Sequence, residues 1–281
     1  MNVLTFDVEE WFHLLDCDAT SSVSGWDDYE SRLDANVDRV LQILDETHTK
    51  ATFFVLGWIA RRYPDAVRRI AAKYQVGCHT MEHRLVWKGS REDFRQDVDS
   101  GVKMLEDITG QKVEAFRAPG FSIREQEGWA FEILHDLGIR CDCSVFPAAH
   151  AHGGMPSFPV MAPALIEYQG VTMKEFPVSF KTIAGRHIVY SGGGYFRLFP
   201  YSVIRSWSRD ASYLLSYIHP RDLDAGQPMV PGLPMARRFR SYVGLKGAAS
   251  KLTRYLREFS FVDIRQADEM TDWSKAAIVR L

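Results

Sequence analysis

Two histidines and two carboxylates carry the first chemical signal in this sequence. His79 and His83 are four residues apart, and a histidine pair at this spacing can bind one metal together, from a helix face or from a tight loop. Asp7 and Glu9 are two residues apart, so on an extended strand their side chains point to the same side. Imidazole and carboxylate groups are the ligands of catalytic zinc-type sites, which need three protein ligands and an open position for water. If these residues hold a metal, the protein is expected to be a hydrolase.

Two further polar residues end predicted strands. Arg117 precedes the Pro119-Gly120 pair, which forces a tight turn, and His219 is held extended by the proline that follows it. Taken singly, each is compatible with a plainer role, as a surface charge or a half-buried core histidine. Because parallel α/β folds gather catalytic groups at the carboxyl ends of their strands, four such features after four strands form a coherent set.

The first half of the chain alternates between strand-like and helix-like segments. Apolar runs predict strands over residues 3–7, 51–56, 76–78, 113–116 and 139–143. Helical spacing predicts helices over 35–44, 58–73, 90–108 and 125–137, with Pro64 as a break and Ser90 with Asp93 as a capping box. This alternation predicts an α/β fold, with a parallel sheet or barrel and helices outside it.

The second half of the chain differs from the first in composition and in its pattern of apolar residues. Residues 146–194 are rich in Pro, Gly and His, and their short β-like runs at 165–168, 172–176 and 187–190 predict an antiparallel insertion or loops over the active face. A helix over 201–210 and a strand over 213–218 follow. Residues 235–259 predict one long amphipathic helix, and 261–264 a last strand. We predict a single domain over residues 1–281, in which 235–281 form a C-terminal helix and strand.

Composition narrows the range of functions. The net charge of −2 over 281 residues leaves no strong basic footprint for nucleic acid, and no apolar run approaches the length of a membrane span. The first residues lack the basic and apolar regions of a signal peptide, so we expect a cytoplasmic protein with its four cysteines reduced.

These residues together resemble a known family, the polysaccharide deacetylases of carbohydrate esterase family 4. The resemblance rests on four motifs that occur in the expected order: Thr5-Phe6-Asp7, His79-Thr80-x-x-His83, Arg117-x-Pro119 and Ile218-His219. Further segments resemble the exosortase-associated branch found with bacterial exopolysaccharide loci; they are 5–12, 116–123, 142–147, 175–177, 193–200, 219–220 and 237–261. The resemblance implies an irregular (β/α) barrel of the polysaccharide deacetylase type.

The resemblance also implies a ligand set, with one departure. Many relatives carry Asp-Asp where this chain has Asp7-Val8, and valine cannot bind a metal. Glu9 is the nearest replacement. We therefore expect Glu9, His79 and His83 to hold the metal and Asp7 to act as general base, although Asp7 could itself bind the metal.

Other roles follow from the same resemblance. Arg117 would pair with Asp7 and hold it ionised. His219 would protonate the leaving amine, and the Gly120 backbone N–H would help hold the oxyanion. Asp142 would support the site, and Trp11 could stack on a sugar face; these last two residues and Gly120 form the predicted substrate and oxyanion contacts.

The predicted function is removal of N-acetyl groups from an amino-sugar polysaccharide, or its precursor, in exopolysaccharide biosynthesis. Zinc is the expected metal, and cobalt, nickel or manganese would suit the same ligands. Three alternatives stay open: a zinc protease of the H-x-x-E-H type through Glu82, which needs a helix at 79–83; a carbohydrate-binding relative inactive through Val8; and a metal-independent amide-ring hydrolase. No oligomeric state is predicted.

Overall fold

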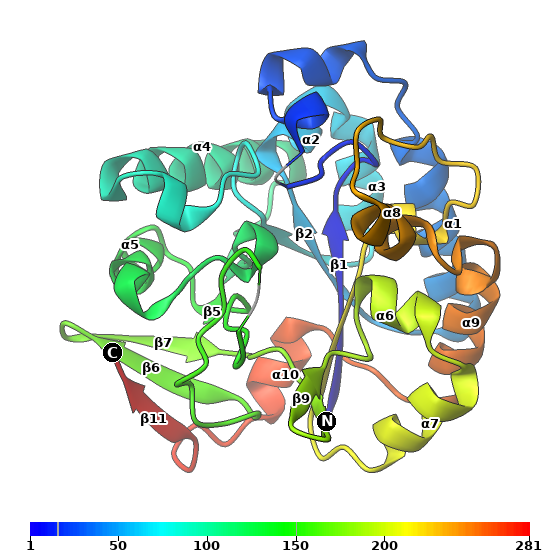
Figure 1. The fold of residues 1–281 in the computed structure, drawn as a ribbon. Helices are drawn as coiled ribbons and strands as arrows, with labels where there is room; N and C mark the ends of the chain where they lie inside the picture. The colour runs from blue at the N-terminus through cyan, green and yellow to red at the C-terminus, as the bar shows by residue number, and fades with distance from the viewer. Residues whose placement is uncertain (16, 150) are drawn as a thin grey trace.

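A mostly parallel sheet forms the centre of the computed structural model, which describes residues 1–15, 17–149 and 151–281 (Figure 1). Within these residues the sheet has nine strands in the order β10-β1-β2-β3-β4-β5-β7-β6-β11, and each neighbouring pair is parallel except β6 with β7. The strands are β1 (Asn2–Val8), β2 (Thr52–Val55), β3 (Gln75–Cys78), β4 (Ala115–Phe116), β5 (Cys141–Asp142), β6 (Ala164–Tyr168), β7 (Val171–Glu175), β10 (Leu214–Ile218) and β11 (Ala277–Arg280).

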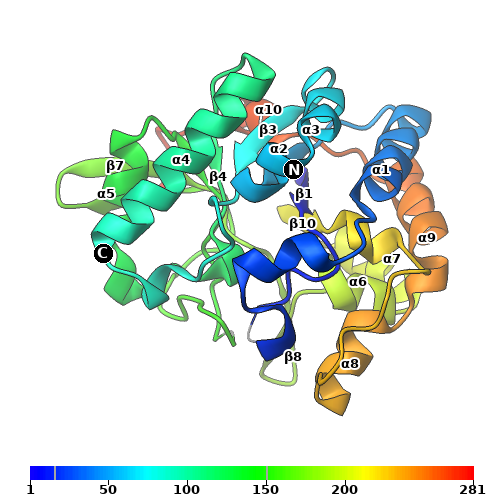
Figure 2. The same ribbon diagram turned by 90° about the horizontal axis from the view of Figure 1, so that it is seen from above.

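Helices surround the strands. Figure 2, which looks at the molecule from above, shows α4, α3, α1 and α9 arranged around β1 and β10. The helices are α1 (Leu33–Thr47), α2 (Gly57–Arg62), α3 (Pro64–Ala71), α4 (Arg91–Thr109), α5 (Trp129–Asp136), α6 (Gly193–Leu198), α7 (Tyr201–Arg209), α8 (Met235–Tyr242), α9 (Leu245–Glu258) and α10 (Ile264–Met270). The predicted α/β class with a parallel sheet is confirmed.

Local signals in the first half place the helix boundaries correctly. Pro64 is the first residue of α3 and separates it from α2, because proline suits the first helical turn and cannot continue the preceding helix. The Ser90 hydroxyl accepts a hydrogen bond from the Asp93 N–H at 3.1 Å, and the Asp93 carboxylate accepts one from the Ser90 N–H at 2.9 Å. The predicted capping box at the start of α4 is confirmed.

The C-terminal segment differs from its prediction in two places. The single helix over 235–259 is wrong, because Gly244 adopts the left-handed conformation (φ 72°) between α8 and α9. The strand over 261–264 is also wrong. Val262 makes only an isolated bridge to Val3, and the Asp263 side chain caps α10 by accepting the Gln266 N–H at 2.8 Å. A short apolar run is compatible with either element, and this one leads into a helix.

The segment 146–194 contributes to the central sheet. β6 and β7 form a hairpin, and β7 pairs in parallel with β5, so this hairpin extends the sheet instead of lying over the active face. A separate antiparallel pair, β8 (Lys181–Ile183) with β9 (Arg186–Ile188), follows it. The four cysteines are buried free thiols. Among the described residues, no helix is both long and apolar enough to cross a membrane.

Candidate active site

The register of the sheet brings the predicted site residues to one edge. Val55 lies opposite both Val8 and Cys78, Cys78 lies opposite Phe116, and Phe6 lies opposite Ile218. Five of the predicted site residues each follow one of these positions along the chain: Asp7, Glu9, His79, Arg117 and His219. Because the strands are parallel, their carboxyl ends lie at the same level, and segments more than 200 residues apart in sequence meet there.

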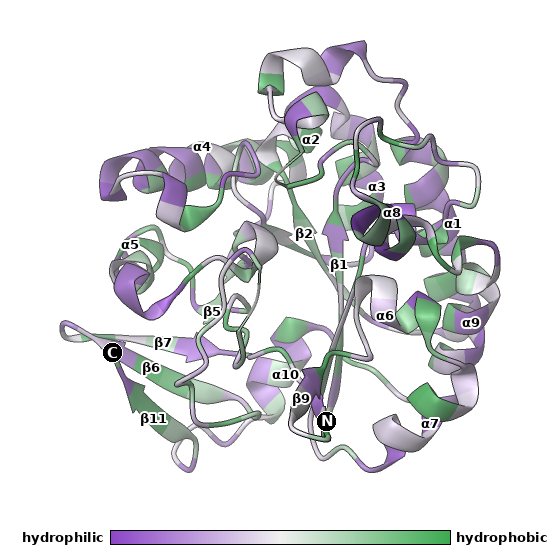
Figure 3. Cartoon of the chain, viewed as in Figure 1, coloured by the Kyte–Doolittle hydropathy of each residue, from purple (hydrophilic) through white to green (hydrophobic). Residues whose placement is uncertain are grey.

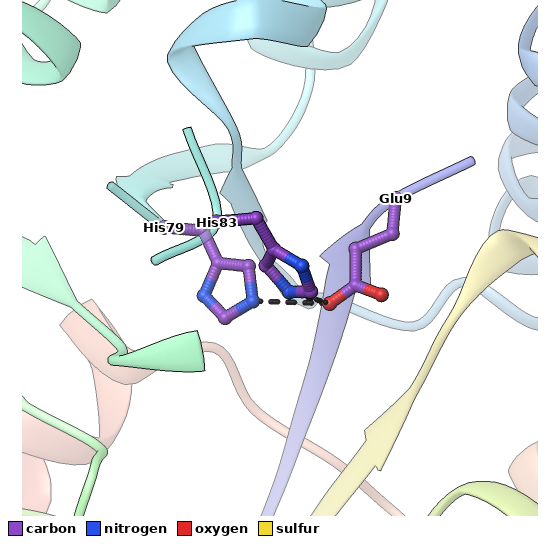
Figure 4. A group of neighbouring side chains, drawn as sticks. All are labelled: Glu9, His79 and His83. Atoms are coloured by element: carbon purple, nitrogen blue, oxygen red, sulfur yellow. Dashed lines mark hydrogen bonds and ion pairs between the residues drawn. The ribbon is translucent and has the colours of Figure 1, made fainter. Parts of the chain in front are cut away.

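Glu9, His79 and His83 form a compact group of possible metal ligands (Figure 4). The Glu9 Oε1 atom lies 3.1 Å from His79 Nε2 and 2.9 Å from His83 Nε2. One ligand atom from each residue lies within 4.8 Å of the others, and all three side chains are buried. Two imidazoles and one carboxylate are the donor set of catalytic metal sites that keep a position open for water.

The protonation of His79 supports a cation in this group. Its Nδ1 atom lies 2.7 Å from the Arg117 carbonyl oxygen, which can only accept a hydrogen bond, so Nδ1 carries the proton. In the neutral imidazole, the Nε2 atom then carries a lone pair, which faces the Glu9 carboxylate. A proton or a metal ion would join these two atoms, and a metal ion would at the same time join His83 to them.

The segment that carries the two histidines is a loop. Thr80 and His83 both have positive φ values, 68° and 57°, and the Thr80 hydroxyl accepts the His83 N–H at 3.1 Å. The H-x-x-E-H protease motif requires both histidines on one helix. Glu82 pairs with Arg84 at 2.5 Å. The structure therefore contradicts the protease alternative.

Asp7 and Arg117 form a buried ion pair beside the ligand group. Arg117 donates from Nη1 to Asp7 Oδ1 at 2.6 Å and to the Thr5 hydroxyl at 2.8 Å, and its guanidinium lies 4.4 Å from the centre of the Phe54 ring. Burial by itself lowers the pKa of Arg117, but the Asp7 carboxylate outweighs burial and raises it. Arg117 is thus a fixed cation paired with the Asp7 carboxylate.

His219 faces both carboxylates from β10. Its Nε2 atom lies 4.0 Å from Asp7 Oδ2 and 3.9 Å from Glu9 Oε1, and its Nδ1 atom lies 2.9 Å from Asp222 Oδ2. Burial opposes the charged form, but Glu9, Asp222 and Asp7 together raise the pKa of His219 to about 9. At neutral pH the ring is therefore a cation able to give up a proton.

Asp222 belongs to the site but was not among the residues predicted from the sequence. It accepts hydrogen bonds from both the backbone N–H and the ring of His219, and it pairs with Arg197 Nε at 3.0 Å. The signal was present as a histidine and an aspartate three residues apart around Pro220, which is the spacing of a capping box. Arg197 comes from α6, and nothing in its local sequence points to His219.

A cavity of about 330 Å³ joins these groups. Its lining includes the expected site residues Asp7, Glu9, His79, His83, Gly120 and His219. Gly120 has a φ of 59°, and an added Cβ would lie 2.7 Å from the Leu15 side chain and 2.9 Å from that of His152, so the turn needs glycine. A larger hollow of about 1080 Å³ shares His13, Leu14, Leu15 and His83 with this cavity.

Trp11 and Asp142 are not among the residues that line the cavity. Trp11 is buried beside Phe12 and Tyr29, and its indole N–H donates to the Glu30 carbonyl at 2.9 Å. The prediction that its ring stacks on a sugar is wrong, because the aromatic core covers the ring. Asp142 is fully buried and accepts hydrogen bonds from the Ser144 hydroxyl and N–H at 2.6 and 3.0 Å, so it does not touch a substrate in the cavity.

Asp142 instead pairs with a second carboxyl group. Glu175 lies opposite it on β7, and its buried Oε2 atom has no hydrogen-bond partner among the described residues, which leaves it free to share a proton with Asp142. Burial, followed by the charge of Asp142, raises the pKa of Glu175 well above its ordinary value. The Ser144 hydroxyl that donates to Asp142 also accepts the Ala118 N–H at 2.8 Å, so this pair supports the turn that follows Arg117.

Two family models match successive parts of the chain. Residues 18–141 match the model described as polysaccharide deacetylase, and residues 143–269 match a domain of unknown function, DUF3473. A peptidoglycan-N-acetylglucosamine deacetylase of Bacillus cereus is 31% identical over 96 residues, which are 34% of this chain and 35% of that protein. A chitooligosaccharide deacetylase of Azorhizobium caulinodans is 33% identical over 106 residues, which are 36% of this chain and 48% of that protein. The matches thus span a third to a half of these curated relatives.

Solved structures share the fold over nearly the whole chain. A putative polysaccharide deacetylase from Mycobacterium smegmatis has a TM-score of 0.69 at 19% identity and covers 100% of this chain and 92% of that one. A family 4 carbohydrate esterase pseudoenzyme from Bacillus anthracis has a TM-score of 0.53 at 16% identity and covers 95% of this chain and 64% of that one. At these identities the likeness shows a common fold. The N-terminal half of this chain is thus similar to polysaccharide deacetylases in sequence over residues 18–141, and the whole chain shares their fold.

Proposed function

We propose that this protein is a metal-dependent hydrolase that removes N-acetyl groups from an amino-sugar polysaccharide or its precursor. The observation that carries the proposal is the convergence of three groups on one cavity: the possible metal ligands, the Asp7–Arg117 pair and the His219–Asp222 pair. Amide hydrolysis needs an activated water, a base to take its proton and an acid for the leaving nitrogen. Each need has a candidate here.

Glu9, His79 and His83 would hold the metal. A divalent cation bound there supplies Lewis acidity, which polarises the acetamide carbonyl and lowers the pKa of a water. Zinc is the metal we propose, since two imidazoles and one carboxylate are common zinc ligands, and cobalt, nickel or manganese would fit the same donors.

The chain's own groups would move the protons. Asp7, held in place by its ion pair with Arg117, takes the proton of the attacking water. The Gly120 N–H donates to the oxyanion that develops on the carbonyl oxygen. His219, positively charged and oriented by Asp222, delivers a proton to the leaving nitrogen. Acetate and a free amino sugar are the products.

The alternative of an inactive carbohydrate-binding protein rests on the presence of Val8. The geometry of the site does not favour this alternative. Val8 is fully buried within the apolar core, while Glu9 occupies the ligand group. The replacement of a family carboxylate at position 8 therefore does not remove the third ligand.

The proposed substrate is an exopolysaccharide bearing N-acetyl groups, or its precursor. The two deacetylase relatives are named for peptidoglycan and for chitooligosaccharides. The larger hollow beside the cavity offers room for sugar units beyond the acetylated one. The proposed place in exopolysaccharide biosynthesis rests on the motif resemblance alone.

Acetate release from chitooligosaccharides tests the proposal. We expect turnover by the purified protein, loss of turnover with a chelator, and recovery when zinc is added back. Metal analysis of the purified protein gives a second readout, in which we expect one divalent ion per chain and its loss in His79→Ala and His83→Ala. Turnover that survives complete metal removal would contradict the proposal and revive the metal-independent alternative.

A further inference from the structure

The C-terminal third of the chain contains a long stretch without acidic residues. No Asp or Glu occurs between Asp224 and Glu258, whereas seven Arg and Lys residues do: Arg237, Arg238, Arg240, Lys246, Lys251, Arg254 and Arg257. The whole chain has a net charge of −2, so this positive charge is concentrated in one region. The stretch forms α8 and α9.

Only part of this positive charge is engaged inside the protein. Lys251 donates to the carbonyls of Phe196, Arg197 and Phe199, Arg254 stacks on Tyr201, and Arg257 lies 3.9 Å from Glu46. By contrast, three exposed cations have no carboxylate partner among the described residues. They are Arg238 and Arg240 on α8 and Lys246 in the first turn of α9.

α8 also exposes large apolar side chains. None of its eight residues is buried, and Met235 and Phe239 are 89% and 56% exposed. They are four residues apart and therefore lie on the same helix face. Met229, 55% exposed, lies beside this face, where its sulfur is 3.3 Å from Arg238 Nη2. Figure 2 shows α8 projecting at the edge of the molecule, and Figure 3 shows its mixture of polar and apolar residues.

The body of the protein holds α8 firmly in this exposed position. The buried Arg197 donates to the carbonyls of Val243 at 2.6 Å and Arg240 at 3.0 Å. The Tyr242 hydroxyl accepts the Val230 N–H at 2.8 Å. The apolar side chains are therefore displayed by a fixed helix and do not fold back on the core.

The same helix borders the cavity of the candidate active site. Arg237, Arg240 and Ser241 of α8 line that cavity together with His219. A ligand held against α8 would thus lie at the mouth of the site.

We propose that the α8 surface, made of Met229, Met235, Arg238, Phe239, Arg240 and Lys246, docks on a phospholipid bilayer with anionic headgroups. A helix with cations and exposed Met and Phe side chains suits the interface, where its apolar groups enter the acyl boundary and its cations meet the phosphates. A soluble polyanion would leave the apolar side chains in water, and a second α8 would bring like charges together. Docking would place the cavity mouth at the membrane, within reach of an acetylated sugar carried by a lipid.

Vesicle co-sedimentation tests the docking without any turnover. We expect the protein to bind vesicles of phosphatidylcholine mixed with phosphatidylglycerol much more tightly than vesicles of phosphatidylcholine alone, by about fivefold for each cation engaged. Arg238→Glu with Lys246→Glu should weaken binding to the anionic vesicles about 30-fold or more. Met235→Ser with Phe239→Ser should weaken binding to them in the absence of any charge change.

Matched controls separate docking from folding and from catalysis. Lys103→Glu with Lys112→Glu makes the same charge change at exposed positions in and just after α4, and it should bind vesicles as the parent does. None of the four substituted α8-surface residues lines the cavity, so both docking variants should keep the circular dichroism and the chitooligosaccharide turnover of the parent.

Three outcomes would overturn the proposal. They are equal binding to the two vesicle types, equal loss of binding in the α4 control, and a parent protein that dimerises through α8 without binding vesicles. Failure of the proposed deacetylase activity would leave the vesicle result standing, since binding is measured directly.

Discussion

Two pairs of buried carboxyl groups lie on the same sheet and have opposite surroundings. Asp7 and Glu9, at the end of β1, face the Arg117 guanidinium and three imidazoles. Asp142 and Glu175, on β5 and β7, face a serine hydroxyl, backbone N–H groups and each other. All four side chains are at most 8% exposed, so burial does not distinguish the pairs.

The neighbouring charges decide what each pair does. Burial raises the pKa of Glu9, but His83, His219 and His79 outweigh burial and hold that pKa well below its usual range. For Glu175, burial and the neighbouring carboxylate act in the same direction, and its pKa rises. The first pair is negative and suited to a metal and to proton transfer, whereas the second keeps a proton and acts as a structural hydrogen bond. Substitutions in the two pairs and in their partners test this difference.

Amide substitutions should separate the roles of Asp7 and Glu9. We expect Asp7→Asn to lower turnover by ~10²–10⁴-fold while the metal stays bound, because the variant lacks only the base. Glu9→Gln should weaken metal binding by about 100-fold or more, since it removes a direct ligand. Metal analysis and acetate release measure both, and Asp142→Asn serves as the control that keeps its metal. If Asp7→Asn strips the metal and Glu9→Gln does not, the two roles are reversed.

Removal of His219 should affect amide substrates selectively. We expect His219→Gln to lower kcat on an acetylated glucosamine oligomer by ~10²–10⁴-fold, with metal content kept, because the leaving nitrogen loses its proton donor. An activated acetyl ester needs no such proton and should be affected much less. Asp222→Asn should move the alkaline fall of kcat to lower pH, because Asp222 helps raise the pKa of His219 to about 9. Equal losses on both substrates, in step with a lower Tm, would assign His219 a structural role.

Removal of the buried cation should destabilise the fold. Arg117→Met keeps an unbranched apolar side chain but leaves Asp7 buried without its partner, and we expect a loss of ~3–5 kcal/mol in the free energy of unfolding. Arg124→Met removes the cation of a more exposed pair with Glu127 and should cost at most about 1 kcal/mol. Urea unfolding measures both. Adding Asp7→Asn to Arg117→Met should recover stability; if it does not, the loss arises from packing and not from the unpaired charge.

The smallest effect concerns Glu175. Its folded pKa is raised, so the stability it contributes is fully present below the unfolded pKa of about 4.3 and is lost as pH rises toward the folded value. The glutamine side chain stays neutral and can still donate a hydrogen bond to Asp142. The free energy of unfolding of Glu175→Gln should therefore fall less above pH ~5 than that of the parent, by about 1 kcal/mol. Urea unfolding across this range is the measurement, with the exposed Glu125→Gln as control. An unchanged pH dependence would mean that Glu175 is ionised in the folded protein.

Local signals were enough to predict most helices and strands in the first half of the chain. Pro64 and the Ser90–Asp93 capping box act within a few residues, so the boundaries they set are readable without the fold. Gly244 is equally local, but a glycine within an amphipathic pattern does not reveal that it will be left-handed, and the predicted helix over 235–259 therefore ran through it.

The residue types and their order along the chain also identified the candidate ligands and the α/β class. Which of these groups meet depends on the packing of segments that are distant in sequence. Strand register set the approach of Glu9 to His79 and His83, and of Arg117 to Asp7. The packing of helices and loops on the sheet also brought Arg197 to Asp222 and buried Trp11. Such contacts between distant segments cannot be predicted from local sequence. Local patterns state which chemistry a residue can perform, and packing determines the partners and the burial that set its charge.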